Sequence, residues 1–128
     1  MASNMSVGAA AAAAGVEAHV LRHWEGVGVL VPHRTATGHR RYTDEHVTRA
    51  KIIRLCQGAG LSLADIRELG GADRSAQVAL IARSQERIRA ELTGLRRADR
   101  FLSHVLHCVH PLLSECPECS DFARASRR

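Results

Sequence analysis

The sequence contains few aromatic residues and no long apolar run. Its 128 residues include four aromatic ones, Trp24, Tyr42, Phe101 and Phe122. So small an aromatic supply argues against a β-sandwich, whereas abundant alanine, leucine and arginine favour helices. No apolar run reaches the roughly 18 residues of a membrane-spanning helix, so we expect no membrane partner. The alanine-rich stretch 7–16 lacks the basic start and strongly apolar centre of a secretory signal, so the expected location is cytoplasmic.

Basic side chains outnumber acidic ones. The 18 lysine and arginine residues exceed the 13 aspartate and glutamate residues, which gives a formal net charge of +5. This balance favours a polyanionic partner, most simply double-stranded DNA. The length is sufficient for one small domain with an appended element.

The first 26 residues predict two short helices. Ser6 is a suitable N-cap for an alanine-rich helix that Gly15 ends, and a second helix is expected over about residues 17–25. Two short helices joined by a glycine-containing turn are typical of a helix-turn-helix. A plain helical hairpin has the same pattern.

The next segment, 29–42, predicts a β-hairpin or wing. It holds the turn formers Pro32 and Gly38 between β-branched and aromatic residues. It also concentrates basic side chains, namely His33, Arg34, His39, Arg40 and Arg41. A basic hairpin beside a helix-turn-helix can lie along a phosphate backbone, although a solvated loop is the simpler alternative.

Two capped helices and one long helix are expected next. Thr43 is a natural N-cap for a helix to about Gln57, and Ser62 with Asp65 resembles a capping box for a helix to Leu69. A heptad pattern then extends over 75–110. Its seam positions are Val78, Ile81, Gln85, Ile88, Leu92, Leu95, Asp99, Leu102, Leu106 and Val109. A seam that is mostly apolar predicts a two-stranded coiled coil and therefore a homodimer.

Cysteines and histidines gather at the end of this heptad pattern. His104 and Cys108 lie four residues apart and share one helical face, while Cys116 and Cys119 form a CxxC pair. We expect Pro111 to end the helix and residues 112–115 to form a loop. Two thiolates of a CxxC pair with a helical His/Cys pair complete a tetrahedral site for zinc or another thiophilic metal ion.

Alternatives to this site remain open. His107 or His110 can replace His104 as the nitrogen ligand, and the cysteines can instead form a thiol–disulfide redox switch or be incidental. A closed set of four ligands favours permanent zinc, whereas a two- or three-coordinate site favours a sensor of copper(I) or a similar ion. Cys56 falls on an apolar helix face and is expected in the core.

The order of motifs in the first half resembles the MerR family of winged-helix bacterial transcription regulators. The resemblance is carried by LRHWE at 21–25, GVLVP at 28–32, GHRRYT at 38–43 and GLSLADIREL at 60–69. It covers roughly residues 6–70 in register and is followed by a dimerisation helix. The family implies a homodimer with antiparallel long helices. It also implies a palindromic promoter that the dimer distorts for RNA polymerase.

The resemblance also implies which residues meet DNA. His19, Arg22 and His23 match the recognition helix, and Arg40 and Tyr42 match the wing. With the basic wing residues added, the predicted DNA-binding set is His19, Arg22, His23, Arg34, Arg40, Arg41 and Tyr42. Trp24 matches a family aromatic but suits the core equally well.

This chain departs from the family pattern at two DNA-facing positions. Glu17 stands where a serine or threonine cap is usual, and His39 stands where the wing usually has an aromatic residue. The operator sequence therefore cannot be carried over from the family.

Metal-responsive members of the family carry two cysteines just after the dimerisation helix, where Cys108 and Cys116 lie. Those that sense zinc, lead or mercury add a cysteine near the start of that helix, where this chain has Ser75 nearby. Further ligands must then come from Cys119 or a histidine. A [2Fe-2S] cluster is less favoured, because members that hold one supply four closely spaced cysteines and this segment has three.

The predicted fold is mainly α. It comprises a winged helix-turn-helix DNA-binding domain (5–71), an antiparallel coiled-coil dimerisation helix (75–110) and a short Cys/His loop (104–122). The predicted function is a homodimeric transcription regulator that responds to a metal ion bound by His104, Cys108, Cys116 and Cys119. A redox-sensing regulator, or a regulator with structural zinc and another effector, is the alternative. CxxC alone also permits a thiol–disulfide oxidoreductase, but the expected βαβ context is absent, so no enzyme is predicted.

Overall fold

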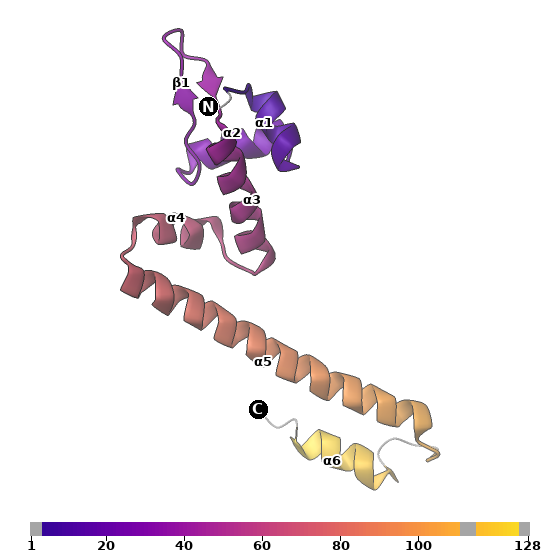
Figure 1. The fold of residues 1–128 in the computed structure, drawn as a ribbon. Coiled ribbons are helices and arrows are strands. Elements are labelled where there is room, and N and C mark those ends of the chain that lie inside the picture. The colour runs from indigo at the N-terminus through magenta and orange to yellow at the C-terminus, as the bar shows by residue number, and fades with distance from the viewer. Residues whose placement is uncertain (1–3, 111–114, 126–128) are drawn as a thin grey trace. The chain divides into compact units, whose positions relative to one another are not determined.

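The computed structural model describes residues 4–110 and 115–125, and this part of the chain is mainly helical (Figure 1). The elements, in order, are α1 (Val7–Ala14), α2 (Ala18–Gly26), β1 (His33–Arg34), β2 (Arg40–Arg41), α3 (Asp44–Gly58), α4 (Leu63–Gly71), α5 (Arg74–His107) and α6 (Pro117–Ala125). They divide into two compact units, residues 1–84 and 85–128, with the boundary inside α5.

None of the helices in the described ranges is long and apolar enough to cross a membrane.

The turn between α1 and α2 forms as predicted. The Ser6 hydroxyl accepts the backbone N–H of Ala9 at 3.2 Å, which caps α1, and Gly15 ends it with a left-handed φ of 73°. Arg54 of α3 donates to the Gly15 carbonyl at 2.8 Å. The left-handed backbone conformation favours glycine at this turn, and a Cβ there would lie 3.3 Å from the Arg54 guanidinium.

The wing is a two-stranded antiparallel hairpin in which His33 pairs with Arg41 and Arg34 with Arg40. The N-terminal segment continues the pairing, because Met5 and Tyr42 form a β-bridge with N–H···O distances of 2.7 and 2.9 Å. The wing is thus attached to the segment that enters α1.

One core holds α1, α2, α3 and the wing together. Its buried members are Ala10, Ala11, Ala14, Leu21, Trp24, Leu30, Tyr42, Ala50 and Ile53. The many alanines of α1 let α2 and α3 approach it closely, and Trp24 is the largest of the fully buried side chains. Trp24 was predicted either to face DNA or to lie in the core. It is 2% exposed and therefore lies in the core. Cys56, predicted in the core, is only partly buried.

The next two helices begin at the predicted caps. At α3 the Thr43 hydroxyl accepts the His46 N–H, and the His46 ring accepts the Thr43 N–H at 2.9 Å, so a histidine takes the place that glutamate or glutamine has in an ordinary capping box. At α4 Ser62 and Asp65 form the predicted box.

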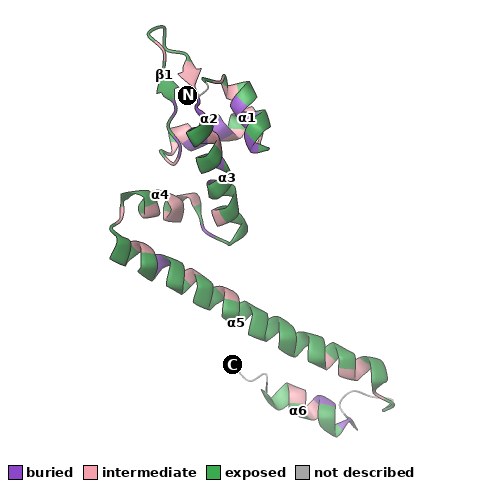
Figure 2. Cartoon of the chain, in the orientation of Figure 1, coloured by how far each residue is buried: buried purple, intermediate pink, exposed green. Residues whose placement is uncertain are grey.

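Helix α5 begins one residue before the predicted start and ends at His107. Pro111 and residues 112–114, which were predicted to end the helix and begin a loop, lie outside the described residues. Most of α5 is exposed (Figure 2), including the large seam residues Val78, Ile81, Leu92, Leu95, Leu102 and Leu106.

Helix α6 was not predicted. The sequence indicated a Cys/His loop, but Pro117 opens a helix that continues to Ala125. Proline favours the first helical position, because its fixed φ suits a helix and its missing N–H has no intrahelical partner there. The CxxC pair therefore spans the start of a helix.

Candidate nucleic-acid interface and metal centre

Helix α2 presents the predicted recognition residues to solvent. His19, Arg22 and His23 are exposed, while Leu21 and Trp24 on the same helix are buried. Burial of one face fixes the helix, because large apolar side chains held in a core define its rotation. The opposite face, with His19, Arg22 and His23, is left exposed.

An ion-pair cluster links the wing to α2. The Glu25 carboxylate accepts from Arg40 Nε at 2.6 Å and from Arg34 Nη2 at 2.9 Å. The hydrogen bond from Arg40, helped by Arg34, lowers the pKa of Glu25 against the opposing effect of burial. Two of the three predicted wing arginines, Arg34 and Arg40, are therefore held in place by the Glu25 carboxylate.

Sequence reasoning did not single out Glu25. It lies nine residues from Arg34 and fifteen from Arg40, so no local spacing rule pairs them. The sequence feature that points to these ion pairs is a single acidic residue at the end of a helix, followed by a strongly basic hairpin.

Tyr42 was predicted to meet DNA, but none of its surface is exposed. Its ring lies in the core, where it meets His46 edge to face with ring centroids 5.8 Å apart, and burial raises the pKa of its hydroxyl. That hydroxyl has no hydrogen-bond partner within the described residues. A side chain without exposed surface offers nothing to DNA in this conformation, so Tyr42 acts here as a core residue. Arg41, the remaining predicted wing residue, is partly exposed.

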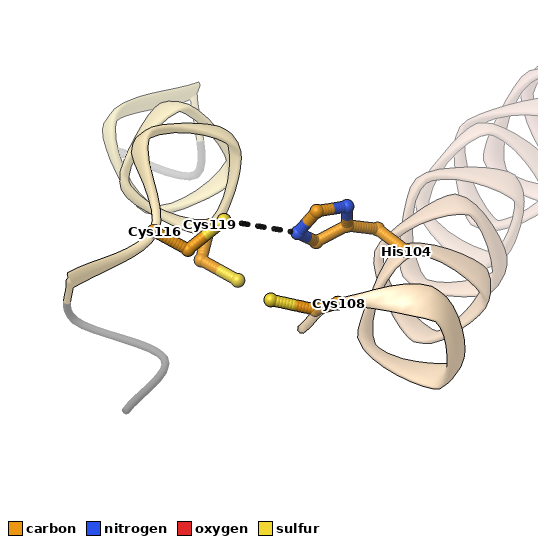
Figure 3. A group of neighbouring side chains, drawn as sticks. All are labelled: His104, Cys108, Cys116 and Cys119. Carbon is orange, nitrogen blue, oxygen red and sulfur yellow. Dashed lines mark hydrogen bonds between the residues drawn. The ribbon is translucent and has the colours of Figure 1, made fainter. Parts of the chain in front are cut away.

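The four predicted metal ligands lie together. His104 lies in the last turn of α5 and Cys108 directly follows that helix, whereas Cys116 directly precedes α6 and Cys119 lies in its first turn (Figure 3). One ligand atom from each residue lies within 4.8 Å of all the others. Cys116 and Cys119 are buried, and His104 and Cys108 partly so.

The structure also distinguishes among the three histidines that were candidates for the nitrogen ligand. His104 Nε2 lies 3.3 Å from the Cys116 sulfur, inside the cluster. His107 Nδ1 lies 2.9 Å from the carbonyl oxygen of Ser103 on its own helix, and His110 Nδ1 lies 3.7 Å from the Cys108 sulfur. His104 is therefore the histidine that joins the three sulfurs.

The two cysteines of the CxxC pair have opposite acidities. The backbone N–H of Cys119 donates to the Cys116 sulfur and, against burial, lowers the pKa of that thiol to about 6. Burial raises the pKa of Cys119 to about 11, and the neighbouring Cys116 adds to this rise. One sulfur is thus a ready thiolate at neutral pH, whereas the other needs a cation beside it to lose its proton.

This donor set fits a thiophilic metal ion. Three sulfurs and one imidazole nitrogen are the ligands of a Cys₃His site, and a bound divalent ion would offset the charge of buried thiolates. The helix N-terminus beneath Cys116 stabilises negative charge there in addition.

Aromatic side chains pack beside the site. Phe122 of α6 meets Phe101 of α5 edge to face, with ring centroids 5.4 Å apart, and lies 5.9 Å from the His104 ring. This packing fixes α6 next to α5 and covers part of the imidazole.

Known proteins resemble most of this chain. The family model described as the MerR HTH family regulatory protein matches residues 5–70. The HTH-type transcriptional regulator HmrR of Rhizobium leguminosarum bv. viciae is 31% identical over 124 residues, which cover 90% of this chain and 92% of that protein. The mercuric resistance operon regulatory protein of Serratia marcescens is 30% identical over 112 residues, which cover 84% of this chain and 78% of that protein.

The fold is shared with a solved structure. The transcription regulator PbrR691 of Ralstonia metallidurans CH34, crystallised with lead(II), has a TM-score of 0.63 and 24% identity. The match covers 91% of this chain and 98% of PbrR691. These relatives are transcription regulators and not enzymes. With a family match over residues 5–70 and relatives similar along most of its length, this chain belongs to the MerR family of helix-turn-helix regulatory proteins.

Proposed function

We propose that this protein is a homodimeric transcription regulator that binds promoter DNA and changes conformation when a thiophilic metal ion binds to its C-terminal Cys/His site. The observation that carries the proposal is the gathering of four ligand atoms within 4.8 Å of one another. Similarity to a regulator of a mercuric resistance operon supports the same kind of effector.

The proposed DNA contacts come from α2 and the wing. His19, Arg22 and His23 are exposed on α2 and suited to base edges, whereas Arg34, Arg40 and Arg41 are suited to phosphates. Since Glu25 already orients two of the arginines, little side-chain freedom is lost on binding.

The proposed dimer forms along α5. Its apolar seam includes Leu95 at 67% exposed and Leu106 at 83%, and a helix of 34 residues in so short a chain needs a partner to cover such a face. An antiparallel pairing with a second copy presents two α2 helices to the half-sites of a palindromic promoter, where RNA polymerase also binds.

The proposed ligands of the metal ion are His104, Cys108, Cys116 and Cys119, all from one protomer. When bound, the ion supplies positive charge to three thiolates and a fixed link between α5 and α6. Four donors favour zinc or a similar tetrahedral divalent ion over two-coordinate copper(I).

A second candidate is a regulator in which zinc is structural and the effector is something else. The closed set of four donors favours it, because sensory and catalytic sites commonly keep an open position whereas structural zinc sites do not.

The test measures metal content and promoter output together. Protein purified anaerobically is analysed for bound metal, and transcription from its promoter is measured as zinc, mercury(II), lead(II) or copper(I) is added. We expect about one metal ion per protomer and a metal-dependent change in output. We expect both to disappear in a Cys116→Ser, Cys119→Ser double variant and to persist in Cys56→Ser.

Two results would contradict the proposal. Unchanged metal content and output in the double variant would show that the cysteines are not the sensor. Loss of α6 structure with an unaltered effector response would favour structural zinc.

A further inference from the structure

The His104 ring contacts a different group at each of its two nitrogens. Nε2 lies 3.3 Å from the Cys116 sulfur, and Nδ1 lies 3.0 Å from Oε2 of Glu118. A carboxylate only accepts hydrogen bonds, so the contact with Glu118 favours the tautomer of the neutral ring that carries its proton on Nδ1. The lone pair of Nε2 then points into the group of sulfurs, where a metal ligand is needed.

Glu118 reaches this position because of its place in the CxxC pair. It lies between Cys116 and Cys119 at the start of α6, so one helical turn carries two sulfurs and the carboxylate. Its own side chain is 74% exposed, while that of His104 is 15% exposed. The carboxylate therefore covers the outer nitrogen of a ring whose inner nitrogen faces the cluster.

His104 has two close competitors for the metal. His107 and His110 lie within six residues of it on or just after the same helix, and both are exposed. His110 Nδ1 even approaches the Cys108 sulfur at 3.7 Å. What distinguishes His104 is its orientation, and Glu118 is the group that fixes it.

We propose that Glu118 is a positioning residue of the metal site. It accepts the Nδ1 proton of His104, holds Nε2 toward Cys108, Cys116 and Cys119, and so selects this histidine over His107 and His110. The inference rests on the proposed metal site. Substitution of a carboxylate that orients a ligating histidine typically lowers metal affinity about 10- to 100-fold. An exposed ion pair, by contrast, contributes little to folding.

The test compares the full-length protein with three variants. Glu118→Ala removes the acceptor, Glu118→Gln keeps an oxygen that can accept from Nδ1, and Glu115→Ala removes an exposed carboxylate next to Cys116 as the matched control. Zinc affinity is measured by competition with a chromophoric chelator. The tautomer and the ligating nitrogen are read from ¹⁵N-histidine NMR of the zinc form, and helix content from circular dichroism.

We expect zinc affinity to fall about 10- to 100-fold in Glu118→Ala. We also expect the single Nε2-bound signal of His104 to be replaced by mixed histidine ligation, at unchanged helix content. Glu118→Gln should restore the His104 signal and most of the affinity, and Glu115→Ala should match the unsubstituted protein.

Two outcomes overturn the inference, and they are distinguishable. If the unsubstituted protein does not bind zinc, the proposed site itself is wrong. If it binds zinc but Glu118→Ala keeps both the affinity and the His104 signal, the site stands and Glu118 has no positioning role in it.

Discussion

The two units of this protein hold their functional side chains in different ways. In the first unit the exposed residues of α2 and the wing are fixed by a core, two capping boxes and the Glu25 ion pairs. In the described part of the second unit only Cys116 and Cys119 are buried, and most of α5 is exposed (Figure 2), including Leu92, Leu95, Leu102 and Leu106. The proposed DNA-reading residues are thus held in place by contacts within their own unit, whereas the second unit is the one that the proposed metal ion and second copy would complete.

This difference suggests a division of roles. A module that reads DNA gains affinity when its contact residues are fixed before binding. A module that responds to a ligand must instead change its order or its contacts when the ligand arrives. Four substitutions test whether the two units differ in this way.

Trp24→Ala should cause the largest loss. Removal of a large buried aromatic side chain costs about 3–5 kcal/mol of unfolding free energy. We expect the first unit to unfold in urea at a much lower midpoint while zinc affinity is retained, because all four ligands lie in the second unit. Leu55→Ala, at a residue 73% exposed, is the control and should shift stability by less than about 0.5 kcal/mol. A simultaneous loss of zinc binding in Trp24→Ala would contradict the independence of the two units.

Leu95→Glu tests the seam of α5. Each buried leucine contributes about 1.5–3 kcal/mol, so a charge at this position should shift the protein toward monomer in sedimentation experiments. Thr93→Glu places the same charge on an exposed residue outside the seam and should leave the dimer intact. If the Leu95→Glu protein remains dimeric, the dimer interface does not depend on this part of the α5 seam.

Glu25→Gln tests how the wing is held. Loss of the partly buried charge pairs with Arg34 and Arg40 should lower stability by about 1–2 kcal/mol and weaken DNA binding in parallel. Glu45→Gln is the matched control, because the Glu45–Arg49 pair is exposed and should contribute less than about 0.5 kcal/mol. If Glu25→Gln strengthens DNA binding, the carboxylate competes with phosphate instead of orienting the arginines.

His46→Gln should have the smallest effect on stability, and only at acid pH. Burial, with help from His33 and Arg49, lowers the pKa of His46 below its ordinary 6.5. The unfolded chain therefore binds a proton at a pH where the folded chain does not. The stability due to the neutral ring is complete above pH 6.5 and is lost as the pH falls toward the folded pKa.

Melting temperatures from pH 8 to pH 5 provide the measurement. Glutamine can form the same capping box without titrating, so the variant should lose less stability than the unsubstituted protein over this range. His39→Gln, at an exposed wing residue, should keep the original pH dependence. Equal slopes for His46→Gln and the unsubstituted protein would contradict this account.

The sequence predicted most of the fold because most of its elements obey local rules. Ser6, Thr43 and Ser62 cap the helices they were expected to cap, and Gly15 takes the left-handed conformation that ends α1. The gathering of the four ligand residues was also anticipated, because a four-residue helical spacing and a CxxC spacing each bring two ligands together.

The two features that differ from the sequence prediction have different causes. Tyr42 was placed at the DNA surface, yet the bridge to Met5 and the packing of His46, which join segments distant in sequence, enclose it. Helix α6 replaces a predicted loop, although its signal is local, because Pro117 occupies the first helical position.

The sequence alone determined the helices, the turns, the wing and the identity of the donor atoms, since each depends on residues a few positions apart. Tertiary structure decided which charged groups meet. Glu25 pairs with Arg40, fifteen residues away, and Glu118 pairs with His104, fourteen positions earlier in the chain. Those pairings follow from how the segments pack in space, because an ionic or hydrogen-bonded contact depends on distance and orientation and not on spacing along the chain.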